Sequence, residues 1–219
     1  MTQVTLCGVM EGTLRLLKYT YFGGSGVTQT TKVWSMFIRV FHWSLVLFFV
    51  AAYITSSSGD DDIHMILGYI VSVLLFVRIV YGFTTQGYGR FSNFLYAPPM
   101  IWQHAKEIAC NQPKHYLGHS PMGSAMVFAL LILLLVLATS GLLYQGWGEY
   151  EGPLWWLDMM PSDVLGHDAW AVHRVLPDIL WGFIALHIAG VALASIQHKE
   201  NLPRAMVTGF KHNKKGDDI

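Results

Sequence analysis

Long apolar runs, separated by polar segments, dominate the pattern of hydrophobic and polar positions along the 219-residue chain. Each of the four runs has the length of about 20 residues that a helix needs to cross a hydrocarbon core of about 30 Å. They lie at about 34–55, 63–83, 121–144 and 169–196. So many apolar runs leave too little polar sequence to cover them in water. The pattern therefore predicts an all-α fold, an integral membrane four-helix bundle.

The composition of the chain strengthens this interpretation. Charged residues make up 13% of the sequence and hydrophobic residues 53%, whereas soluble domains average about 25% charged residues. The formal net charge is zero, and the chain has neither a phosphate-binding Walker sequence nor a dinucleotide fingerprint. We therefore expect contact with membrane lipid and no nucleic-acid partner.

Lysine and arginine are unevenly distributed among the polar segments that flank the apolar runs. The segments 56–62 and 145–168 contain neither residue. The positive-inside rule therefore places these two loops outside and both chain termini in the cytoplasm. The basic residues of the other segments are Arg15, Lys18, Lys32 and Arg39, then Arg90, Lys106 and Lys114, and finally Lys199, Arg204, Lys211, Lys214 and Lys215.

The same orientation bears on the cysteines and on the domain limits. Cys7 and Cys110 fall on the cytoplasmic side, so we expect no disulfide. Residues 33–216 form the predicted membrane domain, and residues 1–32 form an N-terminal cytoplasmic extension. The extension is compatible with a short helix on the membrane surface or with a flexible segment. Residues 145–168 are expected to form an external loop of about 24 residues.

Two histidines occupy the last apolar run, although ionisable groups inside a membrane are costly and usually functional. His173 and His187 are fourteen positions apart, which places them about 40° apart around a helix and about 21 Å apart along it. Both rings therefore face the same neighbours, at two depths. Because successive helices alternate in direction, His64 falls at the outer level of His173 and His42 at the inner level of His187.

Two histidine pairs at two depths favour two stacked bis-histidine haems. Zinc prefers tetrahedral sites with four ligands, which isolated pairs do not provide. The pattern predicts His64 and His173 as ligands of an outer haem iron, and His42 and His187 as ligands of an inner haem iron. A single membrane histidine could instead hydrogen-bond a neighbouring helix. The chain has no CxxCH motif, which excludes covalent c-type haem attachment by the usual sequence.

Two arginines are candidate partners of the haem carboxylates. Arg78 follows His64 by fourteen positions, so it shares that face at the inner level. Arg39 precedes His42 by three positions and shares its face. Both could bind haem propionates through charge-assisted hydrogen bonds. The alternative is that both side chains extend to lipid headgroups at the cytoplasmic surface.

Five separated segments together resemble the bacterial cytochrome b561 family, a four-helix, di-haem group that includes the cytochrome subunits of nickel–iron hydrogenases. The segments are RVFHW at 39–43, HMILGY at 64–69, LGHSPMGSAMV at 117–127, the two histidines of the last run, and ENLPRAMVTG at 200–209. The resemblance implies that His42, His64, His173 and His187 are axial ligands of two b haems. It also implies a bacterial inner-membrane protein that exchanges electrons between an external redox protein and the quinone pool.

The sequence thus predicts a respiratory-chain cytochrome b that carries two b haems and is an electron-transfer component of a larger oxidoreductase complex. Two alternatives stay open. One is a self-sufficient oxidoreductase, such as a superoxide:quinone oxidoreductase, and the other is a haem-free membrane anchor or transporter. We expect quinone to bind near the inner haem, at a cytoplasmic cluster of Arg39, Arg78, His115 and His119.

Acidic residues gather in the two external loops, where basic residues are absent. An acidic surface over the outer haem would attract a positively charged electron carrier and raise its association rate. We therefore expect a periplasmic redox partner, either a c-type cytochrome with a basic patch or a dehydrogenase or hydrogenase. The acidic residues are Asp60, Asp61, Asp62, Glu149, Glu151, Asp158, Asp163 and Asp168.

Overall fold

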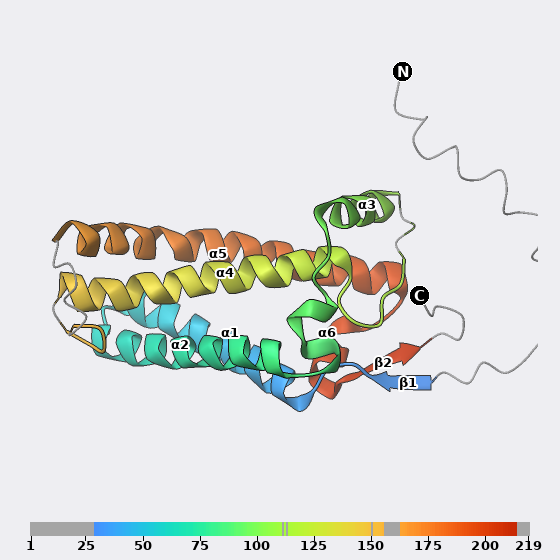
Figure 1. The fold of residues 1–219 in the computed structure, drawn as a ribbon, viewed down its shortest axis with the longest axis horizontal. Helices are drawn as coiled ribbons and strands as arrows, with labels where there is room; N and C mark the ends of the chain where they lie inside the picture. Colours follow the sequence, from blue (N-terminus) through green and yellow to red (C-terminus); the bar gives the residue numbers. More distant parts are fainter. Residues whose placement is uncertain (1–28, 111, 113, 150, 156–162, 214–219) are drawn as a thin grey trace, which may run out of the picture.

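Four long helices form the body of the molecule (Figure 1). The computed structural model describes residues 29–110, 112, 114–149, 151–155 and 163–213. The long helices are α1 (Met36–Ser58), α2 (Asp61–Thr84), α4 (Pro121–Leu143) and α5 (Asp163–His198). Each corresponds to a segment long and apolar enough to cross a membrane. The prediction of a helical four-span membrane protein is confirmed.

Local sequence explains where these helices begin and end. The hydroxyl of Ser35 caps α1 by accepting a hydrogen bond from the backbone N–H of Ile38, and Ser120 caps α4 ahead of a proline at its first position. Gly59 ends α1 with a φ of +79°, a conformation that favours glycine. This residue allows the short turn into α2, whose first turn carries Asp61 and Asp62 at the positive end of the helix dipole.

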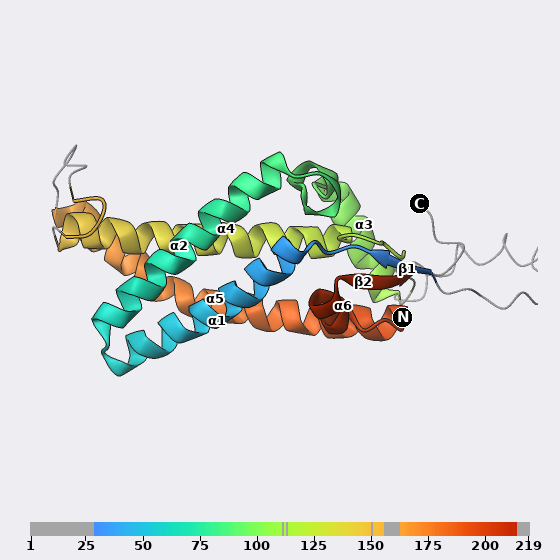
Figure 2. The same ribbon diagram turned by 90° about the horizontal axis from the view of Figure 1, so that it is seen from below.

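The long helices pack in pairs, α1 against α2 and α4 against α5, and α2 also contacts α4. Figure 2 shows α1 and α2 diverging from their shared turn as they run beside the other two helices. A cluster of buried apolar side chains holds the pairs together. Its members are Phe41, Phe49, Val71, Leu75, Leu131, Leu134 and Leu180. Many other large apolar side chains are exposed, as expected for surfaces that face lipid.

Several shorter elements gather at one end of the bundle (Figure 1). They are the single-turn helices η1 (Gly87–Gly89) and η2 (Phe91–Asn93), the helices α3 (Pro98–Ala109) and α6 (Leu202–Thr208), and the strands β1 (Gln29–Lys32) and β2 (Phe210–Asn213). The two strands pair antiparallel, with Gln29 opposite Asn213 and Lys32 opposite Phe210. We call this the inner end, and we call the end that holds the α1–α2 turn the outer end.

The predicted external loop of about 24 residues is wrong in its extent. The chain continues from α4 into a π-helical turn, η3 (Tyr144–Gly148), and α5 already begins at Asp163. Polar residues such as Gln145, Asp163 and Asp168 interrupt the apolar runs, but they lie within helical turns. A Cβ added at Gly166 would lie 2.8 Å from the Cα atom of Gly148, so the two helices approach each other at this point. The predicted surface helix or flexible segment within residues 1–28 lies outside the described residues.

Candidate haem site

His64 and His173 face each other near the outer end of the bundle. Their ring centroids are 6.0 Å apart, and their planes meet at 78°. His64 lies in the first turns of α2, and His173 lies in α5. Two axial ligands of one iron tolerate any angle between their planes, because rotation about a metal–nitrogen axis leaves both bonds intact. The separation and orientation of the two rings therefore suit a shared metal.

Backbone carbonyls hold both rings of this outer pair. The Nδ1 atom of His64 lies 2.9 Å from the carbonyl oxygen of Ala52 in α1, and that of His173 lies 3.0 Å from the carbonyl oxygen of Leu137 in α4. A carbonyl can only accept, so Nδ1 carries the proton and donates in each ring. The Nε2 atom of each ring is then free of a proton, which is the form that binds a metal.

Two residues beside His173 also position its ring, and neither was predicted from the sequence. Ser140 places its hydroxyl 3.3 Å from the Nδ1 atom of His173. A Cβ added at Gly141 would come within 2.8 Å of the ring's Cε1 atom, so only glycine leaves space for the ring there. The signal available in the sequence was a Ser-Gly pair inside an apolar run, since small residues mark close helix packing in membranes.

Gln145 is a further residue that sequence reasoning missed. It is buried in η3, where its Oε1 atom accepts from the hydroxyl of Tyr69 and its Nε2 atom lies 2.8 Å from the sulfur of Met65. Met65 directly follows His64, so this amide ties the outer end of α4 to the segment of α2 that carries the histidine. A polar residue at the edge of an apolar run was the available signal.

His42 and His187 occupy the other level of the bundle, on α1 and α5. The two imidazoles lie close enough to interact electrostatically. The Nδ1 atom of His42 is buried and has no hydrogen-bond partner among the described residues. Trp43 packs edge-on against the His42 ring, with centroids 5.2 Å apart. The structure thus brings together the same two histidine pairs that the helix depths predicted, with the outer pair more firmly held by hydrogen bonds.

Arg78 is buried at the inner level, with only 3% of its surface exposed. Its guanidinium lies 4.6 Å from the ring centroid of Phe91 and 6.0 Å from that of Phe41, the residue before His42. Its Nη1 atom has no partner among the described residues, and no carboxylate in that part of the chain pairs with it. Because an uncompensated buried charge is costly, this position suits an anionic group such as a haem propionate.

Arg39 has a different environment. One of its Nη atoms donates to the carbonyl oxygen of Val207, and its Nε atom lies 3.3 Å from where a Cβ on Gly209 would stand. The side chain therefore fastens α6 to the start of α1. Its Nε atom is buried and, within the described residues, unpartnered, so one N–H group remains available for a ligand.

The two histidines predicted at the quinone site separate in the structure. His119 is enclosed by the rings of Trp34 and Phe94, whose centroids lie 4.7 and 4.3 Å from its own. Burial, together with the charges of Arg78 and Lys211, lowers the pKa of His119 to about 3, so the ring is neutral at physiological pH. His115 instead pairs with Glu200, at 2.8 Å between Nε2 and Oε1. Arg78 and His119 are neighbours, whereas His115 belongs to a second group.

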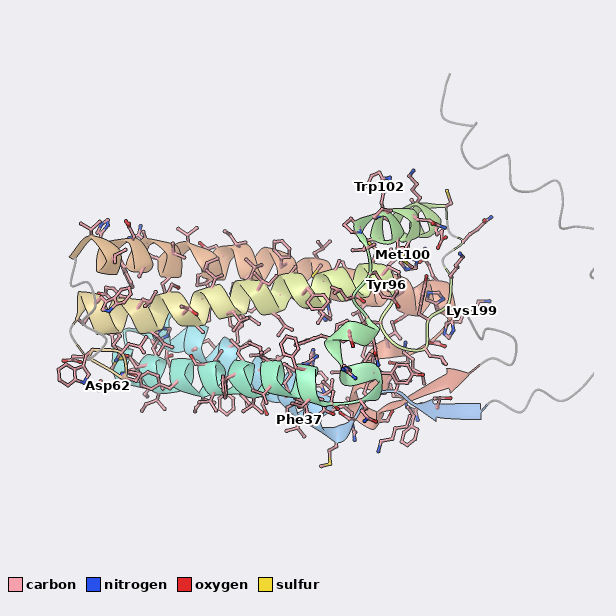
Figure 3. All side chains as sticks on the ribbon, in the orientation of Figure 1. Phe37, Asp62, Tyr96, Met100, Trp102 and Lys199 are labelled. Carbon is pink, nitrogen blue, oxygen red and sulfur yellow. The ribbon has the colours of Figure 1, made fainter. Side chains whose placement is uncertain are left out.

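The external acids lie at the outer end, opposite most of the basic residues. Figure 3 shows Asp62 at the far end of the bundle from Lys199. The described acids Asp60, Asp61, Asp62, Glu149, Glu151 and Asp168 are all exposed. The side chains of the two remaining predicted members, Asp158 and Asp163, lie outside the described part of the chain.

Paired histidines at two levels of a four-span bundle define a class of protein, the transmembrane cytochromes b. Within the described residues, no group of three or more histidine, cysteine and acidic side chains could hold a metal ion, whereas a planar iron cofactor needs only two axial side chains from the protein.

The chain belongs to the prokaryotic cytochrome b561 family, whose sequence profile matches residues 33–209. It is 23% identical over 225 aligned positions to the "Probable Ni/Fe-hydrogenase B-type cytochrome subunit" of Rhizobium leguminosarum bv. viciae, covering 87% of this chain and 92% of that protein. No solved structure matches the chain. The resemblance inferred from the sequence motifs is confirmed, and the protein is a multi-pass inner-membrane b-type cytochrome that transfers electrons.

Proposed function

We propose that this cytochrome carries two b haems and passes electrons between a periplasmic redox partner and the quinone pool. His64 and His173 ligate the outer haem, and His42 and His187 ligate the inner haem. The observation that carries the proposal is the outer pair, whose rings face each other at 6.0 Å with both Nδ1 atoms committed to backbone carbonyls. That arrangement leaves two Nε2 atoms from different helices for one iron.

Haem supplies one-electron chemistry, and the protein controls its ligation, orientation and potential. Arg78 offers an unpartnered buried guanidinium N–H to a propionate, and Arg39 offers its Nε–H. The helix backbones are also open beside two of the ligands. A Cβ added at Gly68 or at Gly190 would contact nothing within 4 Å, so neither position obstructs a flat macrocycle.

The quinone site of the proposal lies at the inner end, near Arg39, Arg78, His115 and His119. His119 supports it most directly, because its Nδ1 atom is buried and has no partner among the described residues. The unpartnered Nη1 atom of Arg78 carries two N–H groups, so it can donate to a quinone carbonyl as well as to a propionate. A quinone carbonyl accepts hydrogen bonds from such groups. Inhibition by a quinone analogue should weaken when Arg78 or His119 is replaced. Inhibition unaffected by substitutions at all four positions would assign the quinone to another site.

The orientation and the partner follow from charge. By the positive-inside rule, the basic segments at the inner end favour a cytoplasmic location for that end and for both termini, and the acidic outer end would then face the periplasm. A c-type cytochrome with a basic patch, or a dehydrogenase or hydrogenase, fits this surface. The name of the Rhizobium relative describes a hydrogenase subunit, which supports membership of this chain in a larger complex.

Haem stoichiometry tests the core of the proposal. Pyridine haemochrome analysis of the purified protein, set against protein mass, should give about two haem b per chain and no haem c, one for each histidine pair. A folded, haem-reconstituted chain that holds one haem or none would overturn the assignment of two sites.

A further inference from the structure

A second group of titratable side chains lies at the inner end, outside the histidine pairs. His115 and Glu200 are joined at 2.8 Å, and 14% and 9% of their side chains are exposed. The two residues are 85 positions apart, so this pair connects the segment before α4 to the segment after α5. A histidine–carboxylate pair buried to this degree is more than a surface ion pair, and none of the residues assigned to the haems takes part in it.

The pair has a neighbour on the solvent side. The ring of His198, in the last turn of α5, lies 5.4 Å from that of His115 between centroids. His198 is only partly buried, and it interacts electrostatically with His115, Glu200, Lys211 and His104. A proton from the aqueous phase can therefore reach the His115–Glu200 pair through the half-exposed imidazole of His198.

The pair also has a neighbour on strand β2. Lys211 on β2 is 8% exposed, its Nζ atom lies 3.4 Å from the carbonyl oxygen of Tyr116, and it interacts electrostatically with Glu200. Burial lowers the pKa of Lys211, and the smaller effect of the negative charge of Glu200 raises it. Burial thus makes this ammonium group a better proton donor than an exposed lysine.

Lys211 leads to the proposed quinone site. Its Nζ atom lies 6.0 Å from the centroid of the Trp34 ring, the same ring that packs against His119. His119 in turn interacts electrostatically with both Lys211 and Arg78. The contacts of His198 with His115 and of His115 with Glu200, and those of Lys211 and His119 with the Trp34 ring, therefore lead from the half-exposed His198 toward Arg78.

We propose that Glu200, His115 and Lys211 form a proton route from the cytoplasmic surface to a quinone bound at Arg78 and His119. This inference rests on the proposed function, and specifically on quinone binding at the inner end. A quinone that takes two electrons from the external donor becomes a quinol only when its two carbonyl oxygens also gain two protons. In the reverse direction, the quinol loses the same two protons to the route.

Each member of the route has a defined task. Glu200 and His115 exchange one proton across their hydrogen bond, and Lys211 passes it toward His119. The neutral ring of His119 accepts a proton at one nitrogen as it releases one from the other. Transfer between members that are not in direct contact proceeds through water. At the same end of the bundle, Glu107 of α3 pairs with His104 and with Lys114, and His104 also interacts electrostatically with His198.

Replacement of Glu200 by Gln tests the route, because it keeps the size of the side chain and removes the carboxylate that would carry the proton. The haem-loaded protein is reduced with dithionite and mixed with a soluble ubiquinone analogue, and proton uptake is followed with a pH-indicator dye. We expect Glu200→Gln to slow quinone reduction and proton uptake together by about tenfold or more, a typical loss for general acid–base groups. Haem content, visible spectra and affinity for the quinone analogue should not change.

Chemical rescue separates a proton route from a structural role. Azide or formate should restore the rate of Glu200→Gln, and imidazole should restore that of His115→Ala. The matched control is Glu107→Gln, which removes a carboxylate from the same end of the bundle. Glu107 pairs with His104 and Lys114 rather than with His115, so this variant should reduce quinone at the rate of the unmodified protein.

The possible failures are distinguishable. If the unmodified protein reduces quinone and Glu200→Gln does so equally fast, the route is overturned and the proposed function stands. A loss of rate that no weak acid restores also overturns the route. If Glu200→Gln loses its haem, the test passes to His115→Ala. Restoration of its rate by imidazole supports the route, and a lack of restoration overturns it. If the unmodified protein reduces no quinone and binds no quinone analogue, the proposed quinone site fails and the route fails with it.

Discussion

The Nδ1 atom of His173 donates across 3.0 Å to the carbonyl oxygen of Leu137, from α5 to α4. This bond orients the imidazole and fixes which of its nitrogens carries the proton. Supporting hydrogen bonds of this kind raise the affinity of a ligand for its metal, and their loss costs about 10- to 100-fold in metal affinity. Under the proposed ligation, this relationship makes the outer haem sensitive to substitutions that replace neither histidine.

Gly141→Ala should disturb the outer haem through this ring. The new Cβ would stand 2.8 Å from the Cε1 atom and 3.1 Å from the Nδ1 atom of His173, so the ring must move and its bond to Leu137 must lengthen. We expect haem retention at the outer site to weaken about tenfold or more, measured by haem content and redox difference spectra. Gly182→Ala is the matched control, because a Cβ there meets nothing within 4 Å. Identical spectra for the two variants would contradict the proposed support of His173.

His187→Ala and His42→Ala should cause the same spectral loss. The two rings lie at one level of the bundle and interact with each other, so either change removes half of the ligation of the inner haem and leaves the outer pair intact. Haem content should fall by about half in each variant, since each site is lost as a unit. If His42→Ala instead matches His173→Ala, the pairing by depth is wrong.

His119 should make the stability of the protein dependent on pH. Its pKa is about 3 in the folded chain and about 6.5 in the unfolded chain. Between these values the unfolded chain binds a proton that the folded chain does not, so stability falls as the pH drops below about 6.5 and continues to fall toward about 3.

Thermal unfolding in detergent, recorded from pH 7 down to pH 4, measures this dependence. His119→Gln should reduce the slope of Tm against pH, because the variant has no group to protonate at this position. His167→Gln is the control, since 79% of the His167 side chain is exposed. An unchanged slope in His119→Gln would show that the ring titrates normally.

Electron exchange with the external partner should slow as salt rises. Exposed charges are screened beyond about 8 Å at 0.15 M ionic strength, and the described acids of the outer end are exposed. Converting Glu149, Glu151, Asp158 and Asp163 to amides should lower the association rate and flatten its salt dependence. The comparison uses stopped-flow kinetics with a basic c-type cytochrome. A rate that is independent of salt in the unmodified protein would remove the electrostatic basis for this partner.

Much of the fold could be predicted because membrane insertion depends on length and hydrophobicity alone. The four spans follow from their apolar runs. Helix α3 could not be found this way, because it is short and amphipathic and begins with two prolines. Figure 3 shows Trp102 on its side away from the bundle, and His104 on the same helix is buried. The extent of the external loop was wrong because polar residues such as Gln145 and Asp168 interrupt the apolar runs without ending the helical structure.

The site was predictable where it depends on the spacing of histidines and unpredictable where it depends on the backbone. The separation of fourteen positions from His173 to His187 gives one face and two depths from helix geometry. The partners of the outer rings are carbonyl oxygens of Ala52 and Leu137, and every residue has such an oxygen. No property of an alanine or a leucine indicates that its carbonyl will receive a histidine proton.

The pairing of β1 with β2 has a consequence for how the protein is made. Gln29–Lys32 leaves the ribosome ahead of every membrane span, and its partner Phe210–Asn213 follows all of them. The first strand must therefore stay unpaired until the last helix has been inserted. Lys211 lies on the late strand, and Arg39 binds the carbonyl of Val207 just before it. A nascent or truncated chain consequently lacks the inner-end contacts. The inner end can assemble only after all four spans have been synthesised.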